Sequence, residues 1–201
     1  MNVVSIKTLV LDYSRPTLYE VAINPPAALG EGEDETGGGG FVSDLLSAIS
    51  YFIGAERQVN LNCRRTSFPP ASFSTFENKT IGPLQKFPYE YLYEDFDMEF
   101  YLDDNHTERN FFLEWMNKIK NPKTNNFGYK DHYSTRIEII QKDRLQLNRY
   151  KVVLVEAYPI SVGEVQLAYD QTDTVNTFNV TFAYTYWYKE VITNPSDVIG
   201  I

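Results

Sequence analysis

The segment Thr174–Glu190, "TVNTFNVTFAYTYWYKE", decides the fold that this sequence can adopt. From Thr177 onward its residues alternate between an aromatic or apolar set and a set made mostly of Thr, Asn and Ala. A repeat of two residues predicts a β-strand with one face toward a core. The set expected to face the core consists of Phe178, Val180, Phe182, Tyr184, Tyr186 and Tyr188.

The far end of this predicted strand raises the question of what it contacts. A strand that continues from Thr177 to Tyr188 is long for a single domain of this size. One interpretation places the end of the strand, with Tyr186 and Trp187, at a contact between subunits. The alternative is an ordinary barrel strand whose Thr-rich face is solvated.

Upstream segments show the same strand pattern. Alternation in Arg15–Asn24, "RPTLYEVAIN", and in Asp95–Asp104, "DFDMEFYLDD", predicts two half-buried strands. Residues 134–141 and 149–158 are expected to pair as a hairpin. Between that hairpin and the last strand, Tyr158–Asp170, "YPISVGEVQLAYD", predicts a corner at which the chain turns back into the sheet.

Two further segments have weaker strand patterns. Glu56–Pro70 is expected to form a strand with Val59, Leu61 and Cys63 on one face, ended by the pair of prolines. Another strand is expected somewhere within Asn78–Pro88.

One long helix is predicted directly after the strand at Asp95–Asp104. Asn105 and Glu108 have the spacing of a capping box, in which each side chain bonds a free backbone amide of the first turn. Helical spacing also places four apolar residues on one face. This stripe consists of Phe112, Trp115, Met116 and Ile119.

These elements predict a mainly β (α+β) fold, a two-sheet β-barrel or sandwich with one flanking α-helix, in a single domain over residues 1–201. Residues 24–54 form an exception, which we interpret as an insertion. It contains an acidic, glycine-rich loop at Ala28–Gly40, which cannot build a core, and then a short amphipathic helix.

Composition excludes several classes of function. The formal charge of −9 opposes binding to nucleic acid through phosphate contacts. The single cysteine, Cys63, excludes an intrachain disulfide and a four-thiolate zinc site, and it suits a reducing cytosol. The first ten residues lack the features of a signal peptide, and the apolar segment 41–53 is too short to span a bilayer.

No motif for catalysis or for a cofactor emerges. Cys63 with His106 or His132 could make a nucleophile and base, but a thiol on the apolar face of a strand is more often inert. The stretch from Asp103 to His106 could hold a metal ion, although a helix cap accounts better for those residue types. We therefore expect no enzyme activity, no metal ion and no cofactor.

The C-terminal residues resemble the tail tube proteins of contractile-tailed bacteriophages, which are related in fold to type VI secretion tube proteins. Arg15 and Pro16 are similar to the N-terminal entry of that family, and "CRRTSFPP" at 63–70 to its cysteine-containing strand. The C-terminal match, in order, consists of Pro159, Val162, Gly163, Glu164, Gln166, Leu167, Tyr169, Asp170, Thr177, Phe178, Val180, Tyr186 and Trp187.

The resemblance implies a subunit that assembles as stacked hexameric rings around a lumen that conducts DNA. It implies the tail sheath, baseplate and tape-measure proteins as partners, no membrane, and assembly in the host cytoplasm into the virion. The residues that it offers for contacts between subunits are Arg15, Pro16, Pro159, Gly163, Glu164, Leu167, Asp170, Tyr186 and Trp187.

Three hypotheses follow. The first is a major tube subunit, which forms tubes without turnover of a substrate. The second is a baseplate initiator or a terminator of the same fold, which forms a single ring. The third is an enzyme or small-ligand carrier built on a barrel, for which the sequence offers little chemistry.

Overall fold

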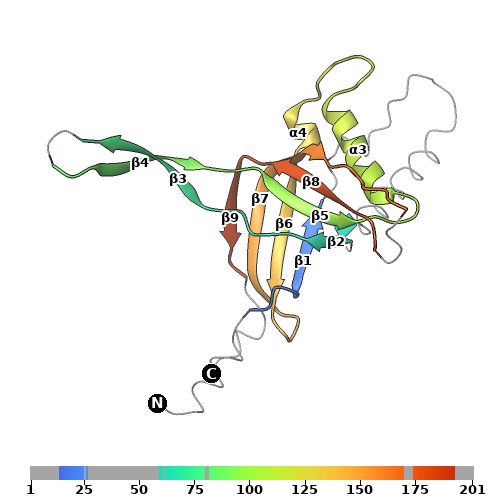
Figure 1. Ribbon diagram of the computed structural model, residues 1–201, viewed down its shortest axis with the longest axis horizontal. Helices are drawn as coiled ribbons and strands as arrows, with labels where there is room; N and C mark the ends of the chain where they lie inside the picture. Colours follow the sequence, from blue (N-terminus) through green and yellow to red (C-terminus); the bar gives the residue numbers. More distant parts are fainter. Residues whose placement is uncertain are drawn as a thin grey trace, which may run out of the picture.

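The computed structural model describes residues 14–24, 26, 59–60, 62–79, 82–169 and 174–192. The predicted insertion at 24–54 lies almost wholly outside these residues, as does Asp170. Figure 1 shows a barrel-like sheet with two helices at one end and a long hairpin that projects to the side. The mainly β fold with a flanking helix is therefore confirmed.

The main sheet has seven strands, and all of its strand pairs are antiparallel. Its order is β1-β6-β7-β8-β5-β2, and β9 pairs with β7. The strands are β1 (Tyr19–Ile23), β2 (Cys63–Arg65), β5 (Phe96–Tyr101), β6 (Thr135–Lys142), β7 (Asn148–Val162), β8 (Thr177–Ala183) and β9 (Tyr186–Glu190).

Side chains link the two end strands of this order. The Tyr19 hydroxyl of β1 donates to the backbone oxygens of Cys63 and Arg64 in β2, at 2.9 and 2.6 Å. The Ile23 amide donates to Oδ1 of Asn60 at 2.9 Å. These bonds satisfy backbone groups that an open sheet edge would leave unpaired, so the sheet nearly closes into a barrel.

The fifteen-residue strand β7 is shared by both halves of the barrel. Its first half pairs with β6 and β9, and its second half pairs with β8. Glu156 lies between them at φ 54°, where the register with β6 shifts. The corner predicted at Tyr158–Asp170 is therefore partly wrong, because the bend comes earlier and the strand continues to Val162.

The single C-terminal strand that the sequence predicts is two strands. The chain leaves β8 at Tyr184 and Thr185, where the Thr185 amide donates to the Val155 oxygen at 3.1 Å. Because β8 and β9 pair with different halves of β7, the alternation of core-facing residues in β8 does not continue into β9. Trp187 packs against the core, whereas Tyr186 and Tyr188 are exposed.

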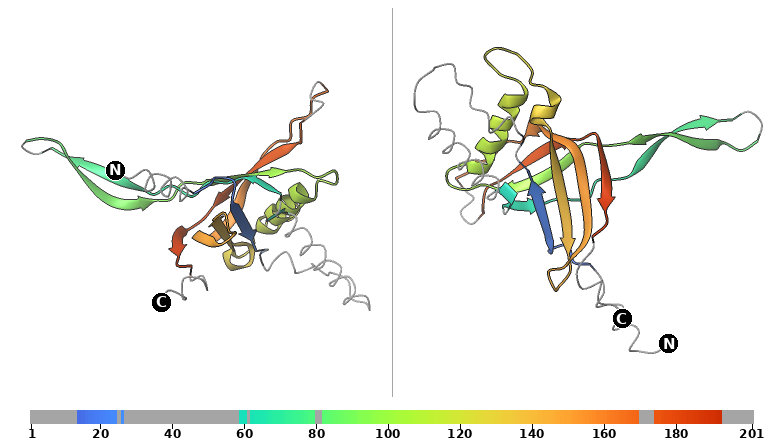
Figure 2. Two further views of the ribbon diagram at one scale, coloured as in Figure 1. Left: turned by 90° about the horizontal axis from the view of Figure 1, so that it is seen from below. Right: turned by 180° about the vertical axis from the view of Figure 1, so that it is seen from behind.

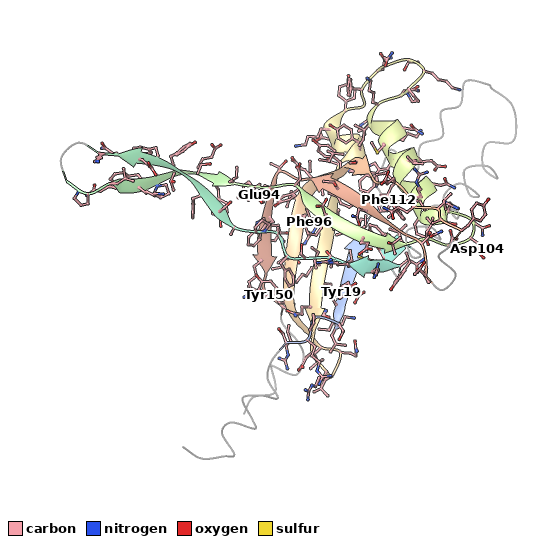
Figure 3. The ribbon with its side chains drawn as sticks, in the orientation of Figure 1. Tyr19, Glu94, Phe96, Asp104, Phe112 and Tyr150 are labelled. Atoms are coloured by element: carbon pink, nitrogen blue, oxygen red, sulfur yellow. The ribbon has the colours of Figure 1, made fainter. Side chains whose placement is uncertain are left out.

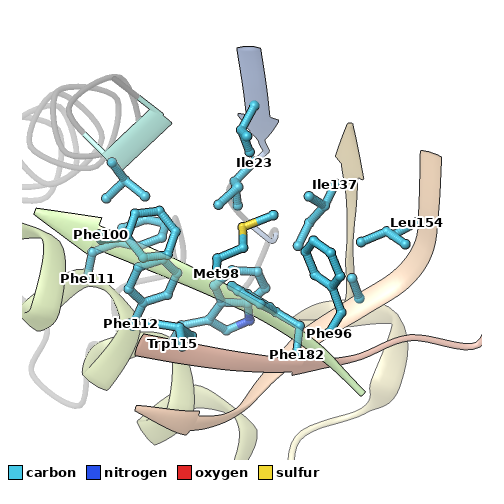
Figure 4. Packing of buried hydrophobic residues seen from close by; sticks show 14 of the residues in the cluster. Ile23, Phe96, Met98, Phe100, Phe111, Phe112, Trp115, Ile137, Leu154 and Phe182 are labelled. Carbon is cyan, nitrogen blue, oxygen red and sulfur yellow. The ribbon is translucent and has the colours of Figure 1, made fainter. Parts of the chain in front are cut away.

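The core is an aromatic cluster between β5, β8 and the helix α3 (Thr107–Ile119), as Figure 4 shows. Phe112 is fully buried, with its ring 5.0 Å from that of Phe100 and 5.8 Å from that of Phe182. Trp115 donates through Nε1 to the oxygen of Tyr133, 2.7 Å away, in the short helix α4 (Lys130–Tyr133). This cluster fixes α3 against the sheet.

The predicted stripe of α3 is confirmed in part. Phe112 and Trp115 are buried as expected, while Met116 and Ile119 are only half-buried. Phe111 is also buried, although the predicted stripe omitted it. The helix packs between the sheet and α4, so its buried face is wider than a single stripe.

The predicted capping box is wrong. His106 is the N-cap residue, at φ 57°, and it makes no side-chain cap bond. Asp103 caps instead, since its carboxylate accepts from the Thr107 amide at 2.7 Å and from the Thr107 hydroxyl at 2.9 Å. Buried Glu108 accepts from the Asp103 amide at 3.1 Å and from the Asn62 side chain, so it ties the helix start to the segment before β2.

The early strands also differ from prediction. Val59 and Asn60 are helical, and the strand expected at Glu56–Pro70 is only the three residues of β2. The strand expected within Asn78–Pro88 is confirmed in part, because one strand ends at Asn78 and a second begins at Gln85 and continues beyond Pro88. These are β3 (Ser72–Asn78) and β4 (Gln85–Leu92). In β4 the aromatic residues Phe87, Tyr89 and Tyr91 alternate with other residues, but every residue of the strand is exposed, so this alternation marks no core face.

Candidate assembly surfaces

The hairpin of β3 and β4, which we call the arm, is the most exposed part of the described chain. It forms a two-stranded sheet separate from the main one, and every residue of β4 is exposed. Figure 2 shows from two directions that the arm extends away from the barrel. A two-stranded ribbon on its own is only marginally stable in water.

Aromatic rings cover both faces of the arm. On one face Phe73 and Tyr91 lie 4.6 Å apart between ring centres, and on the other Phe76 and Phe87 lie 5.5 Å apart. Phe76 is 52% exposed and Tyr89 is 65% exposed. Exposed apolar area of this kind marks a contact surface, because an isolated domain gains nothing from showing it to water.

The backbone of the arm opposes pairing along its edges. The register shifts between Ser74 and Thr75, and Pro88 lies opposite Thr75 without an amide proton to donate. Lys86 and Glu77 form an ion pair at 3.2 Å near the tip. Bulges, proline and charges on an edge discourage strand addition, so the faces of the arm, and not its edges, are the candidate contact surfaces.

Sequence reasoning missed the arm, although a signal was present. Two segments rich in Phe and Tyr, at 72–78 and 85–92, are separated by a short link that contains Gly82. Gly82 has a φ of 107°, which favours glycine in a turn. Aromatic segments joined by a glycine-containing link indicate a hairpin. Figure 3 shows the side chains on both sides of this hairpin.

A second surface, the polar face, is the outer side of β5 and β8. It carries Asp97 and Glu99 opposite Thr181 and Asn179. The Thr181 hydroxyl donates to Asp97 at 2.6 Å, and Arg64 binds Glu99 at 2.7 Å. A hollow of about 680 Å³ lies beside Arg64, Glu99 and Asn179. The Thr- and Asn-rich face predicted for the C-terminal strand is therefore the solvent side of β8.

The residues that follow β7 hold a close contact with this surface. The Gly163 amide donates to the Asn179 oxygen at 2.7 Å, and a Cβ at Gly163 would lie 2.9 Å from that oxygen. Glycine is therefore required at this position for steric reasons. Pro159 is buried within β7, whereas Glu164 and Leu167 are exposed.

The other candidates lie elsewhere, so the structure does not bring the predicted site residues together. Arg15 and Pro16 are exposed before β1, at the opposite end of the barrel from α3. Tyr186 is 44% exposed on β9. The indole nitrogen of Trp187 is inaccessible to solvent, which favours a role in the barrel over a contact between subunits.

Charged side chains join β6, β7 and β9 on the outside of the barrel. Lys151 binds Glu138 at 2.8 Å and Glu190 at 2.6 Å, and Arg136 also binds Glu190, at 3.1 Å. Burial alone would lower the pKa of Lys151, but its bonds to the two carboxylates raise it. The hydrogen bond from Lys151 holds the pKa of Glu190 below its ordinary value. The network fixes β9 against the sheet.

The geometry offers little for catalysis. Burial raises the pKa of the Cys63 thiol to about 12, so the thiolate that acts as a nucleophile is scarce at neutral pH. Within the described residues, no group of His, Cys, Asp and Glu side chains could hold a metal ion. Of the described helices, none is long and apolar enough to span a membrane.

The profile of the phage tail tube protein family matches residues 14–190. The chain belongs to this family. The resemblance to tail tube proteins that the C-terminal residues suggested is confirmed. No curated protein matches the chain significantly.

Solved structures of tube proteins share the fold. The PVC sheath/tube terminator of an extracellular contractile injection system, in the extended state, has a TM-score of 0.58 at 12% identity over 90% of this chain and 99% of that chain. The PVC sheath-tube complex has a TM-score of 0.56 at 13% identity over 92% and 97%. The tube-terminating cap of the anti-feeding prophage has a TM-score of 0.58 at 13% identity over 90% and 93%. At such identities the likeness shows the fold alone.

Proposed function

We propose that this protein is the major subunit of a contractile phage tail tube, which assembles as stacked hexameric rings around a lumen that conducts DNA. The observation that supports the proposal most strongly is the arm, whose aromatic faces have no partner within the described chain. A second copy is the partner expected in a homo-oligomer. The arm contact then joins one subunit to the next.

The polar face of β5 and β8 suits the wall of the lumen. It exposes Asp97 and, in part, Glu99, among hydroxyl and amide groups. Carboxylates repel the phosphates of DNA, so a wall of this kind lets a polyanion slide without binding. The overall charge of −9 is consistent with this arrangement.

The proposal extends to partners and place. The sheath would surround the tube, the baseplate would start it, and a tape-measure protein would occupy the lumen during assembly. The similar PVC structure comes from a sheath-tube complex, which supports a sheath partner here. The assembled protein would belong to the virion, with assembly in the host cytoplasm. The role is structural and needs no substrate or cofactor.

Negative-stain electron microscopy of the purified protein, before and after concentration, tests the proposal. Wild-type protein should form hollow tubes, whereas the variant Phe76→Ser with Phe87→Ser should stay folded and lose them. A control variant carries Phe127→Ser and Tyr129→Ser, which change two aromatics outside the arm that are 72% and 81% exposed. Tubes from the arm variant, or equal loss in the control, would contradict the proposed role of the arm.

A terminator or baseplate initiator of the same fold is the second candidate. Two of the similar structures are a sheath/tube terminator and a tube-terminating cap, which supports this role as the alternative. Such a protein forms isolated six-fold rings and does not polymerise without a template. Rings without tubes at high concentration would favour it over the major subunit.

A further inference from the structure

A basic hollow of about 300 Å³ lies where β1 begins, next to the turn between β6 and β7. In Figure 1 this turn is at the end of the barrel opposite α3 and α4. The residues that line the hollow are Ser14, Arg15, Leu18, Gln141, Lys142, Asp143, Arg144 and Arg149.

The charge of the hollow is unusual for so acidic a chain. Its lining has four cationic side chains and one carboxylate, that of Asp143, while the whole protein carries −9. Lys142 pairs with Glu20 and Arg149 binds Asp143 at 3.4 Å, but Arg15 and Arg144 form no ion pair with any described residue. Clustered cations repel one another, so the hollow favours an anionic partner.

The backbone holds the hollow in shape without that partner. The Lys142 amide donates to the Leu18 oxygen at 2.8 Å, which joins the start of β1 to the end of β6. In the turn, the Asp143 amide donates to the Leu147 oxygen at 2.9 Å, and Gln146 adopts a φ of 61°. A preformed site loses little conformational entropy when it binds.

We propose that this hollow binds the acidic run Glu31–Glu35 of a second copy in the neighbouring ring. The inference rests on the proposed function, because it concerns the stacking of rings. The run "EGEDE" has four carboxylates within five residues, which complements the cationic lining. No other segment of this length in the chain is as acidic.

The topology puts the basic hollow and Asn24, the described residue from which the chain leads toward the acidic run, at opposite ends of β1. At the far end of β1, the Asn24 oxygen accepts from the Thr135 hydroxyl at 2.8 Å, next to α4. The seven-residue step from Asn24 to Glu31 can span about 24 Å when extended. In subunits stacked head to tail, the acidic run of one ring can therefore reach the basic hollow of the next.

Charge reversal on each side tests this contact. One variant carries Arg15→Glu with Arg144→Glu, and the other carries Glu33→Lys with Glu35→Lys. Each alone should form rings, but the protein concentration needed for tubes, measured by sedimentation and microscopy, should rise by about tenfold or more. An equal mixture of the two variants should restore tubes, because the run of each variant then faces a hollow of opposite charge in the other variant.

A charge-matched control carries Lys120→Glu with Lys123→Glu, which are exposed and outside the hollow. It should form tubes as wild type does. Raising the salt from about 0.1 M to about 1 M shortens the Debye length from about 10 Å to about 3 Å and should weaken wild-type stacking.

Each remaining outcome overturns a defined claim. Reversed variants that form tubes as readily as wild type overturn the inference and leave the proposed function standing, as does equal loss in the lysine control. If a single chain that carries all four reversals forms tubes but the mixture does not, the acidic run binds the hollow of its own chain. The claim that a second copy supplies the run is then wrong. Wild-type protein that remains monomeric at every concentration overturns the proposed function itself.

Discussion

The barrel and the arm are both rich in aromatic residues, but they place them in opposite surroundings. Phe100, Phe112 and Phe182 in the barrel are fully buried, whereas Phe76 and Tyr89 in the arm are more than half exposed. Aromatic residues therefore have different roles in the barrel and in the arm. Those in the barrel stabilise the subunit, and we propose that those in the arm stabilise an assembly.

The largest expected effect is in the barrel. Phe112→Ala removes a ring that contacts Phe100, Phe178 and Phe182, and it should lower the free energy of unfolding by about 3–5 kcal/mol. Chemical denaturation of the unassembled subunit measures this change in the free energy of unfolding. Phe76→Ala is the matched change in the arm and should cost less than about 0.5 kcal/mol. Equal losses would erase the distinction between the two regions.

The end of β9 tests the comparison within one strand. Trp187 packs against the core and Tyr186 is exposed, so Trp187→Ala should lower the free energy of unfolding by roughly 1–3 kcal/mol. Tyr186→Ala should leave unfolding nearly unchanged. If instead Trp187→Ala leaves the free energy of unfolding unchanged and abolishes tubes, Trp187 lies at a contact between subunits after all.

Gly163 tests how tightly the loop after β7 is held to the sheet. Gly163→Ala places a Cβ 2.9 Å from the Asn179 oxygen, so the loop must shift, and we expect a loss of about 1–2 kcal/mol. Thermal unfolding measures this loss of stability. The comparison variant is Gly82→Ala, whose Cβ would meet nothing within 4 Å, although the φ of 107° at that position disfavours a side chain. A neutral Gly163→Ala would mean that the loop moves freely.

The smallest expected effect depends on pH. Hydrogen bonds from Lys130 and then Thr185 hold the pKa of Glu156 below its ordinary value near 4.5, so the contribution of this carboxylate is present above that pH and lost below it. The same pairing raises the pKa of Lys130 above 10.5, so its contribution is lost only at higher pH. Lys130→Met should flatten the acid side of a stability–pH profile slightly, since both groups are exposed. An unchanged profile would contradict the pairing.

Local patterns were predictable where the period of the backbone decides the face. The alternation of Phe96, Met98 and Phe100 identified the core face of β5, and helical spacing identified Phe112 and Trp115 of α3. Where several polar residues compete for one role, spacing misled. Asn105 has the capping spacing, yet Asp103 caps, and His106 at the N-cap position has a left-handed conformation.

The candidate surfaces were less predictable than the fold. The motif residues Arg15, Gly163 and Trp187 share no site, and each has its own surroundings in the structure. The arm was missed as a hairpin although Phe87, Tyr89 and Tyr91 alternate along β4, where every residue is exposed. The family resemblance pointed to assembly more directly than the length of the C-terminal strand did.

The sequence by itself determined the mainly β class, the core faces of β5 and β8, part of the core face of α3, and the acidic run at Glu31–Glu35. Those features follow from backbone geometry and from charge, which act over a few neighbouring residues. Only the tertiary structure decided that the last strand breaks at Tyr184, that the arm is a separate sheet, and that Arg15 and Arg144 line the same hollow. Each of these depends on contacts between distant segments, and a linear pattern does not encode which segments become neighbours.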